Sequence, residues 1–487
     1  MPNPVPPSTN LPYPLLVNAA TGTAAPPVPP ENFAAMPSDL AGADQRIAGS
    51  THLGTDWSVD DANELALTGW GIIFASDADP AIQAQLKPLI DLREKQVQGQ
   101  APHKVFSGAD GVQPGQTAAG WAQQHGVSLT AAVHPEQGVP YYLLIVGSPE
   151  RISFEFQALL KMQWAVGRLY FDDIEDYGRY ARAVVEYESD SFQPVQAKNA
   201  AVWVTRNYGD PATALLSGTI ADDFLAPANQ LGARNKFMLS AFVNQKATKA
   251  QLIEIMRGNV PGGPPAVIFT GSHGCEYDSR DPVNQRQKLG SLISQEWNPD
   301  SPVDASCQIC ADDIPADAKL QGTMGFLFAC YSGGCPAQNS YYFNADGSPI
   351  NFAPAPFVAR LPQALLSHGM LAVIAHIDLA FPSAFIDVAG TPQPQAVRTP
   401  LEWLMRGRRT GYAADSLSVL WSSTSSQLAL EQAKAAPLAA AGTNAPGASK
   451  VLAPSPRIVQ MTIARDDARN YIVLGDPATQ LRIDKLK

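Results

Sequence analysis

The chain has 487 residues, of which 45% are hydrophobic and 16% charged, and its formal net charge is −11. This composition is typical of a folded protein with one large or two to three smaller domains, and it excludes a disordered chain. The acidity and the lack of a basic stripe exclude a general nucleic-acid binder. No run of about 18 apolar residues exists, so we expect no membrane span.

The number of cysteines and the N-terminal sequence indicate the cellular compartment in which we expect the protein. Five cysteines make an odd and sparse set for this length, which argues against a disulfide scaffold and favours a reducing environment. The first residues, 1–7, contain neither a basic stretch nor an apolar stretch, so they do not resemble a secretory signal. We therefore expect a cytoplasmic protein.

The first part of the chain divides into two regions. Residues 1–60 form a Pro/Ala-rich N-terminal segment that we expect to be either extended and packed on the surface or partly mobile. Residues 61–195 alternate between strand-like and helix-like patterns and predict a smaller α/β subdomain. Its expected strands are 70–75, 103–106, 141–146 and 164–170, and its expected helices are 80–95, 115–125 and 174–188.

The remaining residues, 196–487, predict a second and larger α/β domain. Alternating strands and helices indicate a mainly parallel sheet with right-handed crossovers and helices on both faces. We expect residues 435–454, rich in Ala, Gly, Pro and Ser, to be a flexible insertion. The expected strands are 201–205, 236–240, 266–271, 325–329, 371–375 and 470–475, and the expected helices are 211–218, 247–258 and 355–367.

Two of these apolar runs end in reactive side chains. The run 266–271 is followed by His273 and Gly274, and the run 325–329 is followed by Cys330. In an open α/β sheet, active sites lie at the carboxyl ends of parallel strands, so neighbouring strands would bring the imidazole and the thiol together. Either motif alone is common in a protein core, but the shared pattern favours a catalytic dyad.

The residue types suit nucleophilic catalysis. A thiolate is the nucleophile, and a neutral imidazole can remove the thiol proton and later return it. Cys330 is therefore the expected nucleophile and His273 the expected base. The backbone N–H groups of Gly274 and Cys330 are candidate donors to an oxyanion.

These blocks resemble the caspase-type clan of cysteine peptidases, in which one apolar block precedes His-Gly and a second precedes Ala-Cys. Within the clan, the chain is most similar to the gingipain family and to CHAT domains. The stretches that carry this likeness are 142–147, 165–168, 187–188, 311–314 and 471–477. The resemblance implies a caspase-like sheet, an endopeptidase that forms an acyl-enzyme, a polypeptide substrate and no required cofactor. Ser272, inserted before the histidine, and Cys335, close behind the nucleophile, depart from the family pattern.

The resemblance also implies where the substrate side chain is read. In the clan this residue often follows the first strand of the catalytic domain, which here is the loop 205–210. Asp210 would select Arg or Lys, whereas Arg206 would select Asp. The gingipain likeness favours Asp210 and cleavage after a basic residue, although both could be solvated loop residues.

Other polar residues near these strand ends are secondary candidates. Asp378, after the run 371–375, could line the pocket, and His376 is more simply a structural histidine. Glu276 and Asp278 could orient the imidazole or bind Ca²⁺ as an activator. Cys307 and Cys310 have the spacing of half a zinc site, but no second pair completes it, so we expect no metal.

Two functions follow from the sequence. The first is a cysteine endopeptidase controlled by a regulatory protein partner, an ion or processing, with neither nucleic acid nor membrane as a partner. The alternative is a catalytically silent caspase-like scaffold or signalling module.

Overall fold

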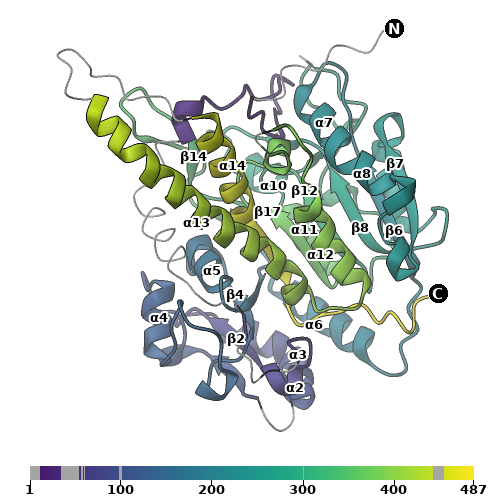
Figure 1. Ribbon diagram of the computed structural model, residues 1–487. Helices are drawn as coiled ribbons and strands as arrows, with labels where there is room; N and C mark the ends of the chain where they lie inside the picture. The colour runs from purple at the N-terminus through teal and green to yellow at the C-terminus, as the bar shows by residue number, and fades with distance from the viewer. Residues whose placement is uncertain are drawn as a thin grey trace.

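A single ten-stranded sheet forms the centre of the protein (Figure 1). The computed structural model describes residues 11–33, 54–55, 59, 61–97, 101–299, 301–387, 389–442 and 455–487, without the side chains of 435–442. In sheet order the strands are β3 (His103–Phe106), β2 (Trp70–Phe74), β4 (Tyr142–Val146), β5 (Ala165–Leu169), β18 (Tyr471–Gly475), β17 (Ala372–His376), β12 (Met324–Phe328), β8 (Pro265–Gly271), β6 (Ala197–Val204) and β7 (Met238–Val243).

The sheet is mainly parallel, as predicted, with one exception. Every pair of neighbouring strands runs parallel except β17 and β18, which are antiparallel. Two parallel blocks of opposite direction therefore meet at β17 and β18. The carboxyl ends of β6, β8, β12 and β17 all lie at one edge, because these four strands belong to the same block.

Helices cover both faces of the sheet, which explains why its strands are continuous apolar runs. All residues of β2, β4, β8, β12, β17 and β18 are buried. A parallel strand with helices on both sides has no face left for polar residues. One helical layer contains α3 (Pro80–Val97), α6 (Ile174–Glu188) and α11 (Arg360–Ser367). Another contains α5 (Phe154–Leu160), α8 (Asp222–Leu225), α12 (Gln395–Met405), α13 (Thr410–Gly442) and α14 (Pro456–Asn470).

The helix α13 corrects one sequence expectation. It crosses the sheet diagonally beside α14 (Figure 1) and reaches Gly442, so residues 435–442 are helical rather than a flexible insertion. The many alanines there favour a helix, since alanine has the highest helix propensity. Residues 443–454, the rest of the expected insertion, lie outside the described residues.

The predicted boundary at residues 195 and 196 falls in the connection between α6 and β6. Strands from both predicted parts nevertheless share one sheet, because the C-terminal strand β18 lies between β5 and β17. The two parts are therefore joined by the backbone pairing of β5 with β18.

A small second sheet lies beside the edge where the four strands end. Its strands, in order, are β1 (Leu16–Asn18), β9 (Gly274–Glu276), β10 (Leu292–Ile293) and β11 (Gln308–Ile309). The N-terminal segment thus contributes a paired strand next to Gly274. Among the described residues, none of the helices has the length and apolar character needed to cross a membrane.

Candidate active site

His273 and Cys330 leave neighbouring parallel strands at the same level. In the pairing of β8 with β12, Gly271 lies opposite Phe328, and each reactive residue follows two positions later. The N–H of Ser272 donates to the carbonyl of Phe328 (3.2 Å), so the pairing continues almost to the two side chains. Adjacent strands lie about 4.8 Å apart, and the predicted juxtaposition of the histidine and cysteine segments is present.

Gly274 allows the two backbones to approach each other closely. A Cβ at this position would lie 2.0 Å from the carbonyl oxygen of Cys330, which no larger residue can tolerate without a shift of the backbone. The glycine after the histidine is therefore a steric requirement of this edge. Its N–H donates to the carbonyl of Leu15 (2.8 Å).

Asp210 holds the imidazole of His273. Its Oδ2 lies 2.8 Å from Nε2 of His273, and the backbone N–H and hydroxyl of Thr213 donate to the same oxygen at 2.8 and 2.5 Å. Burial alone would raise the pKa of Asp210, but the charge of His273 and these hydrogen bonds lower it below its usual value. Asp210 is therefore ionised and points at the histidine.

The local sequence explains how Asp210 reaches this position. It caps the N-terminus of α7 (Pro211–Leu216), with Pro211 in the first helical position. An aspartate before proline, followed by a polar residue at the third helical position, is a typical helix start. This signal could have located the carboxylate at a helix end, but it contains no information about the strand β8 beside it.

The imidazole is fixed on one side and free of hydrogen bonds on the other. Its Nδ1 has no hydrogen-bond partner among the described residues, although it is buried. The ring also packs edge-on against Trp297, at 5.4 Å between centroids. With Nε2 occupied by Asp210, Nδ1 is the nitrogen left for proton transfer.

The thiol of Cys330 is completely buried. Its sulfur accepts a hydrogen bond from the N–H of Ala380 (3.1 Å), and Tyr331 behind it has a left-handed backbone (φ +57°). Burial raises the pKa of Cys330 well above its usual value, while backbone groups of Ala380 and Leu15 act in the opposite direction. In this state the group is a thiol rather than a thiolate.

Asp378 and His376 lie under the cysteine loop rather than in an open pocket. Asp378 is buried, and its carboxylate accepts hydrogen bonds from Ser340 (2.6 Å) and from the N–H of Leu379 (2.8 Å). Burial raises the pKa of Asp378 above its usual value. His376 is also buried, with Nδ1 at 2.9 Å from the carbonyl of Asp378. The arrangement suits two structural side chains.

The other candidates lie outside the immediate contact shell of the imidazole. The side chain of Arg206 is exposed, and only its backbone is held, by Gln295. Glu276 is on β9, and Asp278 forms an exposed ion pair with Arg280. Neither carboxylate is hydrogen-bonded to His273 in the described structure; Asp210 occupies that role instead.

A cleft of about 550 Å³ lies beside β9, and Glu276, Asp278 and Cys310 are among the residues that line it.

All five cysteines are free thiols. Within the described ranges, no three His, Cys, Asp or Glu side chains are grouped so that they could hold a metal ion.

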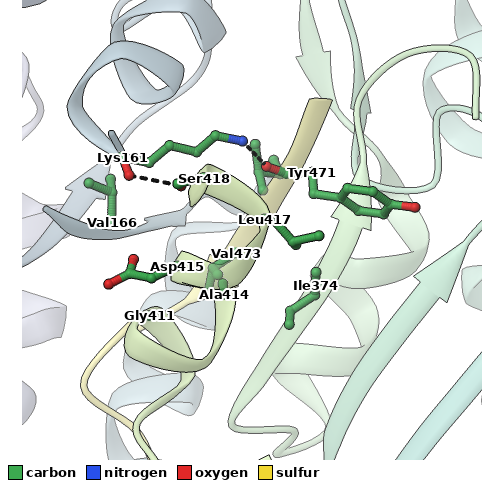
Figure 2. A pocket seen from close by; sticks show the side chains of 11 residues that line it. Lys161, Val166, Ile374, Gly411, Ala414, Asp415, Leu417, Ser418, Tyr471 and Val473 are labelled. Carbon is green, nitrogen blue, oxygen red and sulfur yellow. Dashed lines mark hydrogen bonds between the residues drawn. The ribbon is translucent and has the colours of Figure 1, made fainter. Parts of the chain in front are cut away.

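A separate cavity of about 20 Å³ lies beneath α13, far along the chain from the dyad. Figure 2 shows Lys161 and Asp415 on its wall, with the amine of Lys161 directed at the backbone of Tyr471. Burial lowers the pKa of Lys161 to about 7 and raises the pKa of Asp415 to about 7. The amine is bonded to three backbone carbonyls, so it stabilises the start of β18.

Comparison with known proteins gives distant structural likenesses only. No family model and no curated protein matches the sequence. A solved protease structure is 11% identical over 87% of this chain and 79% of its own, with a TM-score of 0.45. Two structures of the Saccharomyces cerevisiae separase–securin complex are 10% identical over 69% of this chain, with TM-scores of 0.34 and 0.30. They are matched over only 15% and 16% of their own length.

Proposed function

We propose that this protein is a caspase-like cysteine endopeptidase in which Cys330 is the nucleophile and His273 the acid–base. The observation that supports the proposal is the matched ending of β8 and β12, since His273 and Cys330 each follow two positions after the paired residues Gly271 and Phe328. The anchoring of His273 on Asp210 supports it, because a catalytic imidazole must be held in one orientation.

The chemistry uses groups that the chain supplies. His273 Nδ1 takes the proton of the Cys330 thiol, and the sulfur attacks the carbonyl carbon of a peptide bond. As the C–N bond breaks, the imidazolium gives its proton to the leaving amine, and a thioester remains. Water then attacks the thioester, which releases the acid and restores the thiol. We assign the oxyanion donor to the Gly274 N–H, which donates to the carbonyl of Leu15 in the structure.

The preference for Arg or Lys is a separate part of the proposal and needs its own test. The sequence assigned it to Asp210, whose carboxylate is bonded to His273 and Thr213 in the structure. Arg206 is the exposed charged residue of the same loop, and it would favour cleavage after Asp. Substrates ending in Arg, Lys, Asp and Leu should therefore be compared directly.

One observation favours the alternative of a silent scaffold. The thiol is fully buried and its pKa is raised, so the structure as it stands is not poised to react. A scaffold would keep Cys330 in this state under all conditions, whereas an enzyme must be able to expose it.

The test is a panel of fluorogenic peptides with and without Ca²⁺, together with a peptidyl electrophile. We expect Cys330→Ala and His273→Ala each to lose about 10³-fold or more in kcat/KM, since both belong to one catalytic unit. Labelling should occur at Cys330 and require His273. Cys310→Ala is a matched control, because it removes a free and only partly buried thiol. Equal turnover by wild type and Cys330→Ala would contradict the proposal.

A further inference from the structure

The N-terminal segment 11–33 lies directly over the two strand ends. Its strand β1 pairs in parallel with β9, so that Leu16 lies opposite Gly274 and Val17 opposite Cys275. The sequence predicted only an extended or partly mobile surface segment here. The structure instead makes these residues part of the sheet that begins at the histidine loop.

Both backbone groups of Leu15 are bound by residues of the candidate site. Its carbonyl accepts a hydrogen bond from the Gly274 N–H (2.8 Å), the group that would face an oxyanion. Its N–H donates to the carbonyl of Ala380 (3.0 Å), whose own N–H contacts the sulfur of Cys330. The carbonyl of Leu15 therefore stands where a peptide carbonyl under attack would stand.

Further contacts fix the segment along its length. Val17 is fully buried in a cluster with Cys275, Ile293, Trp297 and Cys307, and Trp297 packs on the imidazole. At the far end, Phe33 packs on Phe381 at 6.0 Å between centroids. The segment is held by main-chain hydrogen bonds and apolar burial, which is how an extended peptide docks on a sheet edge.

We infer that residues 11–33 form an inhibitory arm that binds as a substrate does, with Leu15 on the acyl side of the bond to be cut. The inference rests on the proposed function, and it has two consequences. The thiol and Nδ1 of His273 stay buried until the arm leaves. The side chain before the bond to be cut is apolar, in place of the Arg or Lys that the sequence suggested, because the side chain of Leu15 is completely buried.

The test uses substitutions that release the arm in the 487-residue chain and leave His273 and Cys330 unchanged. Val17→Asp places a charge in an apolar cluster and should expel β1. Val283→Asp is the matched control, because the same substitution falls on a side chain that is 71% exposed. Gly22→Val is a second releasing variant, since a Cβ there would lie 1.5 Å from the carbonyl oxygen of Ser301.

Two quantities are measured, namely the alkylation rate of Cys330 by iodoacetamide and the turnover of peptides ending in Leu, Arg, Lys or Asp. We expect Val17→Asp and Gly22→Val to raise both by about tenfold or more, with Leu preferred, and Val283→Asp to match the wild type. A synthetic peptide of residues 11–23 should restore inhibition, whereas a scrambled one should not. A cut between Leu15 and Leu16 would also support the placement.

A failure of the arm inference can be distinguished from a failure of the proposed function. If wild type already labels and turns over as fast as both variants, the arm is not inhibitory and the inference is overturned, while the dyad stands. If the variants expose Cys330 but no peptide is cut, the proposed function fails and the arm only shields a thiol. If released enzyme cuts after Arg or Lys but not after Leu, the apolar preference is wrong. Circular dichroism shows whether each variant has folded. If Val17→Asp has not folded, the result with Gly22→Val decides whether the arm is inhibitory.

Discussion

The carboxylate of Asp210 combines two structural tasks at the residue scale. It caps α7 through Thr213, and it holds His273 through Nε2. The cap and the imidazole thus share one carboxylate oxygen, which leaves Nδ1, rather than Nε2, for the proton transfer that we propose.

Asp210→Asn tests this positioning role against the role of substrate reader that the sequence suggested. Asparagine keeps the size of the side chain but removes the charge that stabilises an imidazolium. We expect kcat to fall by about 10²-fold for every peptide of the panel, with little change in KM and no change in preference.

Arg206→Gln is the control for that experiment, because it alters the exposed charge of the same loop and leaves His273 untouched. A substrate reader behaves differently from a positioning residue. If Asp210→Asn lowers turnover only of the Arg- and Lys-ending peptides, the carboxylate reads substrate, and the positioning role is wrong.

At the scale of elements, the site depends on how closely β9 passes β12. The backbone of Gly274 runs against the carbonyl of Cys330, and the same residue donates its N–H to the carbonyl of Leu15. Close contact between two backbones can be kept only if one of the residues lacks a Cβ.

Gly274→Ala should therefore separate the two strand ends. We expect a loss of about 10²-fold in kcat/KM, because the oxyanion donor and the nucleophile move apart. Peptide turnover in a background with the arm released gives the readout. Gly218→Ala is the control, because nothing lies within 4 Å of the added Cβ. Full activity of Gly274→Ala would show that its N–H does not contribute.

At the scale of the whole molecule, one buried ionic network joins the first and last parts of the chain. Asp476, in the turn after β18, accepts hydrogen bonds from Arg93 (2.7 Å) on α3 and from Trp70 (3.0 Å) on β2. Arg93 also pairs with Glu188 on α6 (2.6 Å). Burial would lower the pKa of Arg93, but the two carboxylates raise it above its usual value, so it stays charged.

Asp476→Ala should destabilise the entire protein by about 3 kcal/mol or more, because it removes a partner from a buried arginine. Since the sheet is continuous, we expect one cooperative unfolding transition in denaturant for both wild type and variant. Asp190→Ala is the control, because its carboxylate is fully exposed and 3.8 Å from Arg482. Two separate transitions would instead support independent domains at the predicted boundary.

The sequence alone determined the local elements and the positions of His273 and Cys330 after two of them. Continuous apolar runs predicted strands such as β4, β8, β12 and β17, and periodic patterns predicted helices such as α3 and α6, because burial depends on residue type and spacing. The position of His273 and Cys330 directly after two such runs was enough to place them at a sheet edge. These signals are short-range, so a single chain displays them.

Only the tertiary structure decided which distant residues meet. Three such contacts connect segments that are far apart in the chain. Asp210 is hydrogen-bonded to His273, β17 pairs antiparallel with β18, and the Leu15 carbonyl accepts a hydrogen bond from Gly274. No periodicity encodes such contacts, because they depend on the order of strands in the sheet and on which surface remains for the N-terminal segment to cover. The proposed dyad could therefore be predicted from the sequence, whereas the contact of Leu15 with Gly274 could not.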